Sequence, residues 1–182
     1  MKKILVTAAL FLVGFAVQAQ DKFMCRNANV YFNADGPTEK IEAKNGQGAS
    51  VLDTKTGNME FMVALKAFEF EKALMQEHFN ENYVESDKFP KVVFKGTIQD
   101  FSKVNFKKDG VYPVQLKGKM TLHGVTNDMT ADGTLEVKGG SVTGKSKFTI
   151  KCSDYKIEIP SLVKDKVNNV VTIQVTAPYK PM

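Results

Sequence analysis

The sequence predicts an all-β protein: an eight-stranded antiparallel up-and-down barrel with one helix inserted between the third and fourth strands. Residues 114–122 and 142–152 alternate, one residue at a time, between apolar or small side chains and polar side chains, many of them lysines. A period of two places successive side chains on opposite faces of a strand. Eight such segments, mostly joined by short turns, favour closure into a barrel with an apolar interior.

The first three strands are expected at residues 22–33, 40–52 and 59–70. In the first strand, alternation places Cys25 outward, and it places the following side chains inward: Met24, Ala28, Val30 and Phe32. The third strand carries apolar residues on both faces, which predicts that it is covered on both sides.

The period changes to that of a helix over residues 71–84. The apolar face of this helix would be formed by Leu74, Met75, His78, Phe79 and Tyr83. The dipeptide Phe89-Pro90 then starts the next strand, because the residue before a proline favours an extended backbone. We expect this helix and the Phe89-Pro90 bend to cap or gate one mouth of the barrel.

The remaining strands are expected at residues 91–101, 111–123, 125–138, 141–152 and 167–179, with tight turns at Gly124 and at Gly139-Gly140. Small residues occupy inward positions of these strands: Gly96, Gly118, Gly144 and Ser146. They are compatible with an open cavity, and equally with strands that bend at a barrel corner.

Residues 1–19 are expected to be a secretory signal peptide. A basic start, Met1-Lys2-Lys3, is followed by an uncharged apolar run that is short for a membrane span. Cleavage is expected near Ala19, which would leave residues 20–182 as one periplasmic or secreted domain. That length is sufficient for a single domain with its own hydrophobic core.

Charge and cysteine content argue against several function classes. The net charge is +5, but the lysines are spread along the strands and Arg26 is the only arginine. Nucleic-acid binding, which usually needs clustered arginines or stacking aromatics on a basic face, is therefore not expected. Cys25 and Cys152 are assigned to opposite faces, which argues against a disulfide between them.

The sequence contains no pattern typical of catalysis or metal binding. His78 and His123 are the only histidines, and a zinc site needs three or four ligands with two at short spacing. Nucleophile elbows, Gly-rich phosphate loops and His-Glu-x-x-His motifs are absent. We therefore expect no enzyme, no metal and no cofactor. A membrane-spanning barrel is disfavoured because its apolar face would have to point outward.

Three segments resemble a known family. Residues 120–126 (MTLHGVT) resemble the L-T-x-H-G-V-T hairpin of the YceI-like proteins, residues 89–96 (FPKVVFKG) resemble their Y/F-P-x-x-x-F segment, and residues 151–155 (KCSDY) are similar to their Arg-Ser-Asp-Phe-Gly stretch. Their order and spacing also match, and the resemblance covers essentially all of residues 20–182. It implies a lipocalin-like barrel secreted to the periplasm, and some members hold a polyisoprenoid or quinone-type lipid in the lumen.

The expected function is therefore to carry or sequester a polyisoprenoid or quinone-like lipid in an apolar lumen. The lumen and its mouth are expected to be lined by Phe32, Phe61, Val63, Phe68, Leu74, Phe79, Phe94, Ile98, Leu116, Met120, Met129, Leu135, Phe148, Ile150, Val171 and Ile173. The main alternative is a filled barrel that acts through its surface and contains no cavity above ~300 Å³. An unrecognised enzyme would need titratable residues clustered around the mouth. The sequence is compatible with a monomer or a homodimer.

Overall fold

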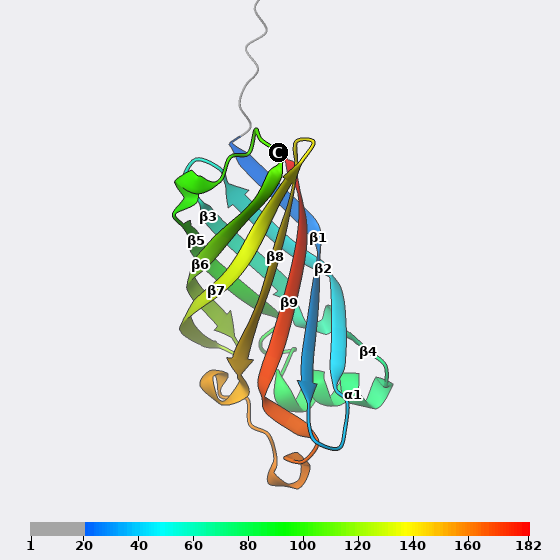
Figure 1. The fold of residues 1–182 in the computed structure, drawn as a ribbon. Helices are drawn as coiled ribbons and strands as arrows, with labels where there is room; N and C mark the ends of the chain where they lie inside the picture. The colour runs from blue at the N-terminus through cyan, green and yellow to red at the C-terminus, as the bar shows by residue number, and fades with distance from the viewer. Residues whose placement is uncertain (1–20) are drawn as a thin grey trace, which may run out of the picture.

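Nine strands form one antiparallel sheet that closes on itself in the computed structural model, which describes residues 21–182 (Figure 1). The predicted signal peptide at residues 1–19 lies outside the described residues. The strands are β1 (Lys22–Asp35), β2 (Glu42–Asp53), β3 (Asn58–Ala64), β4 (Glu69–Phe70), β5 (Lys91–Gln99), β6 (Gly110–Leu122), β7 (Val125–Lys138), β8 (Ser141–Lys151) and β9 (Val167–Pro181).

The strand order is that of an up-and-down barrel. Around the barrel it runs β1-β9-β8-β7-β6-β5-β3-β2, and pairing of β1 with β2 closes the circle. The two-residue strand β4 pairs only with β2, through Ala43 and Phe70. The predicted eight-stranded antiparallel barrel is therefore confirmed, with one short strand added to it.

Two tight hairpins set the register of the central strands. His123 and Gly124 join β6 to β7 with φ of 50° and 73°, and Gly139 and Gly140 join β7 to β8 with φ of 56° and 78°. Two-residue loops with positive φ at both positions match the right-handed twist of the strands that they connect. They fix the pairing that puts the apolar set of each strand inward.

The inserted helix is shorter than expected. It comprises α1 (Ala73–His78) followed by one π-helical turn at Phe79–Tyr83, and both lie at the lower end of the barrel in Figure 1. Short 3-10 turns occur at Leu65–Ala67, Phe101–Lys103, Cys152–Tyr155 and Ser161–Val163. The position of the helix, after the third long strand and before β5, agrees with the prediction.

The expected third strand, residues 59–70, is interrupted by the 3-10 turn at Leu65–Ala67. The prediction that both of its faces are covered is wrong, because Met62 is 40% exposed and Ala64 is also exposed. The turn changes the direction of the chain, so that Phe68 becomes buried together with Val63. The apolar residues after Ala64 therefore belong to the end of the barrel rather than to an outer face of a strand.

The predicted facing of the first strand is wrong near its start. β1 is irregular in its pairing with β2 between Cys25 and Ala28, and such a bulge reverses the facing of the residues on one side of it. Phe23 and Cys25 are buried, and Met24 lies on the other face. Cys25 and Cys152 are nonetheless both free thiols, as expected.

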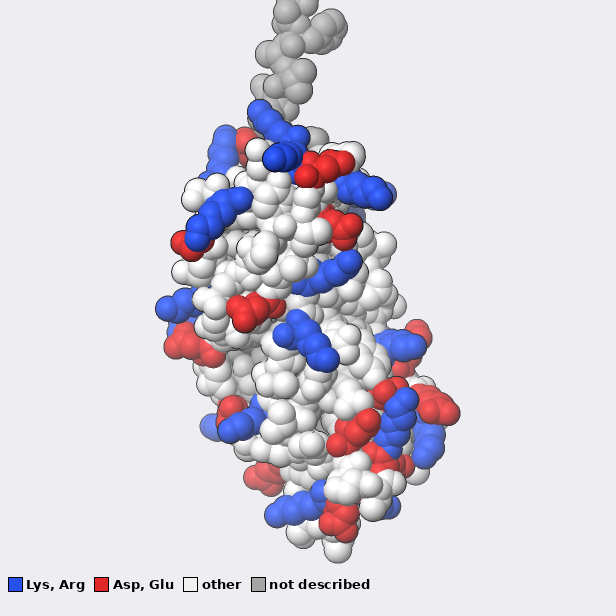
Figure 2. All heavy atoms as spheres, in the orientation of Figure 1, with Lys and Arg blue, Asp and Glu red and all other residues white. Residues whose placement is uncertain are grey.

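Charged side chains of both signs are interspersed on the face of the barrel drawn in Figure 2, without a continuous basic stripe. Lys119 pairs with Asp128 at 2.9 Å and Lys145 with Glu136 at 3.2 Å, both across neighbouring strands. Within residues 21–182, no helix is long and apolar enough to cross a membrane.

Candidate functional site

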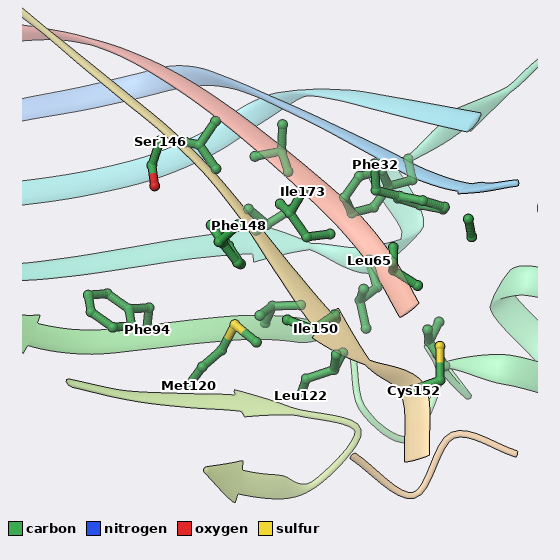
Figure 3. Close-up of a pocket in the computed structure, with 18 of the residues that line it drawn as sticks. Phe32, Leu65, Phe94, Met120, Leu122, Ser146, Phe148, Ile150, Cys152 and Ile173 are labelled. Atoms are coloured by element: carbon green, nitrogen blue, oxygen red, sulfur yellow. The ribbon is translucent and has the colours of Figure 1, made fainter. Parts of the chain in front are cut away.

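An apolar cavity of about 580 Å³ runs through the interior of the barrel (Figure 3). Every residue predicted to line the lumen does line it, and in Figure 3 the labelled side chains of Phe94 and Met120 lie on β5 and β6, facing Phe148 of β8 and Ile173 of β9. The volume exceeds the ~300 Å³ limit of the filled-barrel alternative and falls in the range of ordinary ligand pockets. That these residues contact a ligand stays a prediction.

Alternation along the strands produces this lining. Within β6, Met120 and Leu122 are buried, whereas the two lysines of the strand, which point to the other face, are exposed. The residues of β8 alternate in the same way. The small inward residues have two different roles. Gly144 and Ser146 line the cavity, whereas Gly96 and Gly118 face each other where β5 and β6 approach closely. A Cβ on Gly96 would lie 2.5 Å from the Lys117 carbonyl oxygen.

One end of the cavity is sealed by packing, and we call it the blind end. A second core cluster fills the barrel beside the Gly139-Gly140 turn: Phe23, Cys25, Ala28, Leu52, Ile98, Leu135, Val137, Val142, Ala177 and Tyr179. The Tyr179 hydroxyl is bonded to Ser50 Oγ at 2.7 Å, and Ser50 Oγ donates to the Glu60 carbonyl oxygen at 2.9 Å. The polar groups at the blind end are therefore bonded to one another, and burial raises the pKa of Tyr179.

The opposite end, the capped end, is covered by aromatic side chains around α1. Phe32 of β1 lies 5.3 Å from Phe68, 5.6 Å from Phe70 and 5.5 Å from Phe79, measured between ring centroids. Phe70 and Phe79 are 5.1 Å apart. The helical segment is therefore attached to the barrel mainly by stacked and edge-on rings, which stabilise it without a polar contact inside the lumen.

The sequence-based prediction missed several lining residues at the capped end. They come from the β1–β2 hairpin and from the irregular segment before β9: Ile41, Ile157, Ile159 and Val163. Ile157 and Ile159 alternate in the sequence, but they lie between the expected strands at 141–152 and 167–179. Asn169 of β9 is exposed, and its amide donates to Ser153 Oγ at 3.2 Å.

Charged side chains of the lining gather mainly at the capped end of the cavity. Glu39, Lys72, His78 and Lys166 line it at the capped end, where the Lys72 ammonium lies 3.2 Å from a Glu39 carboxylate oxygen. Within the described part of the chain, no group of three or more His, Cys, Asp or Glu side chains is arranged to hold a metal. Thr134, Lys145 and Ser146 also belong to the lining, where β7 and β8 pair, and the rest of the interior offers mainly apolar contact.

His123 links three elements at the capped end rather than facing the lumen. Its Nδ1 lies 3.1 Å from the Tyr155 carbonyl oxygen, its Nε2 lies 2.7 Å from Glu85 Oε2, and its ring packs edge-on against Phe89. Glu85 follows the helical segment, so the β6–β7 turn is joined to the end of the cap. His123 therefore joins the β6–β7 hairpin to the cap and to the Cys152–Tyr155 turn.

The one thiol in the lining is protected. Cys152 is 8% exposed, and burial raises the pKa of its thiol above the ordinary value. A thiolate, rather than a thiol, is the reactive species of cysteine. Cys152 therefore contributes to the apolar wall in the manner of a small hydrophobic residue.

A family model and several solved structures match this chain. The YceI-like domain family matches residues 16–178. A polyisoprenoid binding domain from Saccharophagus degradans superposes with a TM-score of 0.78 at 11% identity, covering 90% of this chain and 100% of that one. BcnA of Burkholderia cenocepacia gives 0.69 at 14%, covering 83% and 95%, and a Campylobacter jejuni YCEI protein gives 0.50 at 16%, covering 99% of each chain. A comparison with curated proteins found no significant match.

Proposed function

This chain belongs to the YceI-like family, and on that premise we propose that it binds a polyisoprenoid or quinone-like lipid in the barrel cavity, as a carrier or for sequestration. The observation that supports this most directly is the apolar cavity of about 580 Å³ with a sealed blind end. The structural relative from Saccharophagus degradans is described as a polyisoprenoid binding domain. Its similarity in fold makes the same class of ligand the first to test.

The physical basis of the proposal is non-covalent burial of a hydrocarbon tail. Each methylene moved from water into the lumen contributes about 0.8 kcal/mol before the cost of association is subtracted. Apart from Lys145 on β8, the charged groups of the lining lie at the capped end, so the tail would lie in the barrel with any polar head at the rim near Lys72 and Lys166. The helical segment and its phenylalanines would cover that end.

Secretion to the periplasm is part of the proposal. The predicted signal peptide at residues 1–19 would direct the chain out of the cytoplasm and into the periplasm. In that aqueous compartment, a lipid with a long hydrocarbon tail needs a protein to keep it from water. Expression of the full chain in a bacterium, followed by fractionation and mass measurement of the processed protein, tests this location and the cleavage near Ala19. A full-length product that remains in the cytoplasm would contradict it.

The binding proposal is tested by native mass spectrometry and by lipid extraction of the purified protein, which we expect to yield a bound long-chain lipid. A second measurement uses Phe94→Trp. The chain has no tryptophan, so the new indole would report on the lumen alone, and its fluorescence is expected to change when a prenyl lipid is added. Protein that carries no lipid and takes up no isoprenoid on titration would refute the proposal.

A further inference from the structure

The barrel wall contains a seam where two neighbouring strands stop pairing although both continue. β7 and β8 pair from Lys138 and Ser141 up to Gly133 and Ser146, and the pairing ends there. β7 extends for residues 125–132 and β8 for residues 147–151 beyond that point. Figure 1 shows the two strands side by side near their turn and spread apart below it.

The seam is bounded at both ends by side-chain hydrogen bonds. Ser146 Oγ donates to the Asp132 carbonyl oxygen at 2.7 Å at the point where the ladder ends. At the other end, the Asn127 amide donates to the Asp154 carbonyl oxygen at 2.7 Å, which ties the start of β7 to the turn after β8. Among the described residues, no backbone hydrogen bond joins the two strands between these points.

The side chains along the seam are nevertheless those of a paired ladder. Continuing the existing register sets Asp132 opposite Lys147, Thr130 opposite Thr149 and Asp128 opposite Lys151. On the inward face it sets Ala131 opposite Phe148 and Met129 opposite Ile150. Opposite charges and threonines that face each other across antiparallel strands stabilise pairing, so every cross-strand pair favours a closed seam.

The lysines of β8 are free to make those pairs. Lys147 and Lys151 form no ion pair among residues 21–182, whereas Lys145, in the paired part, bonds to Glu136. Asp128 is bonded to Lys119 and Asp132 to the Gln115 amide, both of β6. Closure would therefore add partners for the two lysines without breaking the β6–β7 ladder.

The cavity reaches the seam. Its lining includes Ser146, and it also includes Thr134 and Lys145, a facing pair whose positions belong to the outward set of the two strands. The cavity therefore reaches the wall beside the last paired residues of β7 and β8, at the point where the seam begins. Phe148 and Ile150, which point inward from β8, are only partly buried there, as expected where the wall is open beside them.

We propose that the β7–β8 seam is a lateral door through which a long-chain lipid enters and leaves the lumen, and that it closes by continuation of the antiparallel ladder. The inference rests on the proposed function, because a door needs a ligand that passes through it. A lateral opening suits an extended tail, which can be laid into the barrel along its length. The capped end keeps its phenylalanines in place during this process.

The experiment tethers the seam in its closed state. Thr130→Cys with Thr149→Cys places two cysteines at facing positions of the continued ladder. Facing residues of paired strands have Cα atoms about 4.5–5.5 Å apart, within the range that a disulfide spans. The matched control is Glu136→Cys with Thr143→Cys, a pair on the same face of the same strands in the part that is already joined. The native Cys25 and Cys152 are buried, and peptide mapping identifies which thiols are linked.

The measurement is the association rate of a geranylgeranyl probe labelled with nitrobenzoxadiazole. We expect the seam disulfide to form, to slow uptake by at least about tenfold, the lower end of the range over which association rates vary among variants of one site, and to be reversed by reductant. The control disulfide should leave the rate unchanged. A seam disulfide that does not form where the control forms, or that forms without changing the rate, would overturn the door.

A second tether distinguishes the other route into the barrel. Glu39→Cys with Lys72→Cys, linked by a short bifunctional thiol reagent, holds α1 against the β1–β2 hairpin at the site of the present ion pair. If this tether slows uptake while the seam disulfide does not, the lipid enters beneath the cap and the inference is wrong. Failure of the untethered, reduced protein to bind any probe would instead refute the proposed function, so the two failures are separable.

Discussion

The hydrogen-bonded pair at the blind end, Ser50 and Tyr179, predicts that two substitutions will reduce the free energy of unfolding by unequal amounts. Ser50 Oγ uses its single proton for the Glu60 carbonyl oxygen, so the Tyr179 hydroxyl must donate to Ser50 Oγ, and both residues are almost fully buried. Tyr179→Phe removes this donor together with its hydrogen bond, and it leaves no other buried donor without an acceptor. Ser50→Ala leaves the tyrosine hydroxyl buried without its acceptor.

The magnitudes follow from this direction of donation. Tyr179→Phe should reduce the free energy of unfolding by about 0.5–1.5 kcal/mol, the net value of one intramolecular hydrogen bond. Ser50→Ala should reduce it by about 2–3 kcal/mol, because it adds the desolvation penalty of an unsatisfied buried donor. In the double variant that penalty disappears, so its loss should fall short of the sum by about 1–2 kcal/mol.

Urea unfolding of the four proteins, followed by circular dichroism, measures these values, and equal m-values would show that the unfolded states are comparable. The exposed pair Thr121 and Thr126, whose hydroxyls are 2.8 Å apart, is the control. Its valine variants should show coupling below about 0.5 kcal/mol, because water replaces a lost partner at the surface. If Tyr179→Phe is as costly as Ser50→Ala, or if the two losses add, the blind end is not dry and this account of its hydrogen bonds is wrong.

Three further predictions concern the cap, the wall and the response to alkali. Phe32→Ala should lower the free energy of unfolding by about 3–5 kcal/mol, whereas Val111→Ala, at a position 61% exposed, should change it by less than about 0.5 kcal/mol; equal effects in urea unfolding would contradict the assigned core. Gly96→Ala should destabilise by about 1–3 kcal/mol through collision with the β6 backbone, while Gly46→Ala, with its nearest neighbour at 3.6 Å, should be tolerated; thermal unfolding of both variants checks this. Because the pKa of Tyr179 is raised in the folded state, its contribution is complete below about pH 10, the ordinary tyrosine value, and is lost as the unfolded chain ionises above it; the decline of stability between pH 9 and 11 should be shallower in Tyr179→Phe, and an unchanged slope would refute it.

The long strands were predictable because their alternation is local information. β6, β7 and β8 have bounds within a residue of those expected, and tight turns with positive φ join them. Their apolar sets face the lumen because period-two patterning and a barrel interior give the same facing. The lumen-facing residues of these long strands could therefore be identified from the sequence, before the size of the lumen was known.

The errors arose where the chain changes facing without a signal of its own. The irregular pairing between Cys25 and Ala28 reverses the predicted orientation of Cys25, and the 3-10 turn at Leu65–Ala67 interrupts the expected third strand, whose Met62 and Ala64 are exposed. Neither segment contains a glycine or proline that would mark a break. Both features are set by the need to close the barrel and cover its end, which is tertiary information.

Gly96 and Gly118 show a limit of a different kind. A small inward residue in a strand can enlarge a cavity or allow two backbones to approach, and the sequence is the same in both cases. The structure separates them: a Cβ on Gly118 would collide with the Lys95 carbonyl oxygen, whereas Gly144 lines the cavity. Cavity volume depends on how such positions meet across the barrel, so it could not be obtained from any single strand.

The β7–β8 seam is the place where local pattern and structure disagree without a steric cause. At the bulge in β1 and at the paired glycines, neighbouring backbone explains the departure, whereas the facing residues of the seam, Asp132 with Lys147 and Asp128 with Lys151, are complementary and apart. Here the side chains favour pairing of the two strands, but the strands are unpaired. Such a disagreement is typical of a functional site rather than of a packing compromise. Two states of similar free energy, one open and one closed, account for both the pattern and the gap. A barrel with a sealed blind end and an aromatic cap needs such an element, because a lipid must be able to enter without dismantling either end.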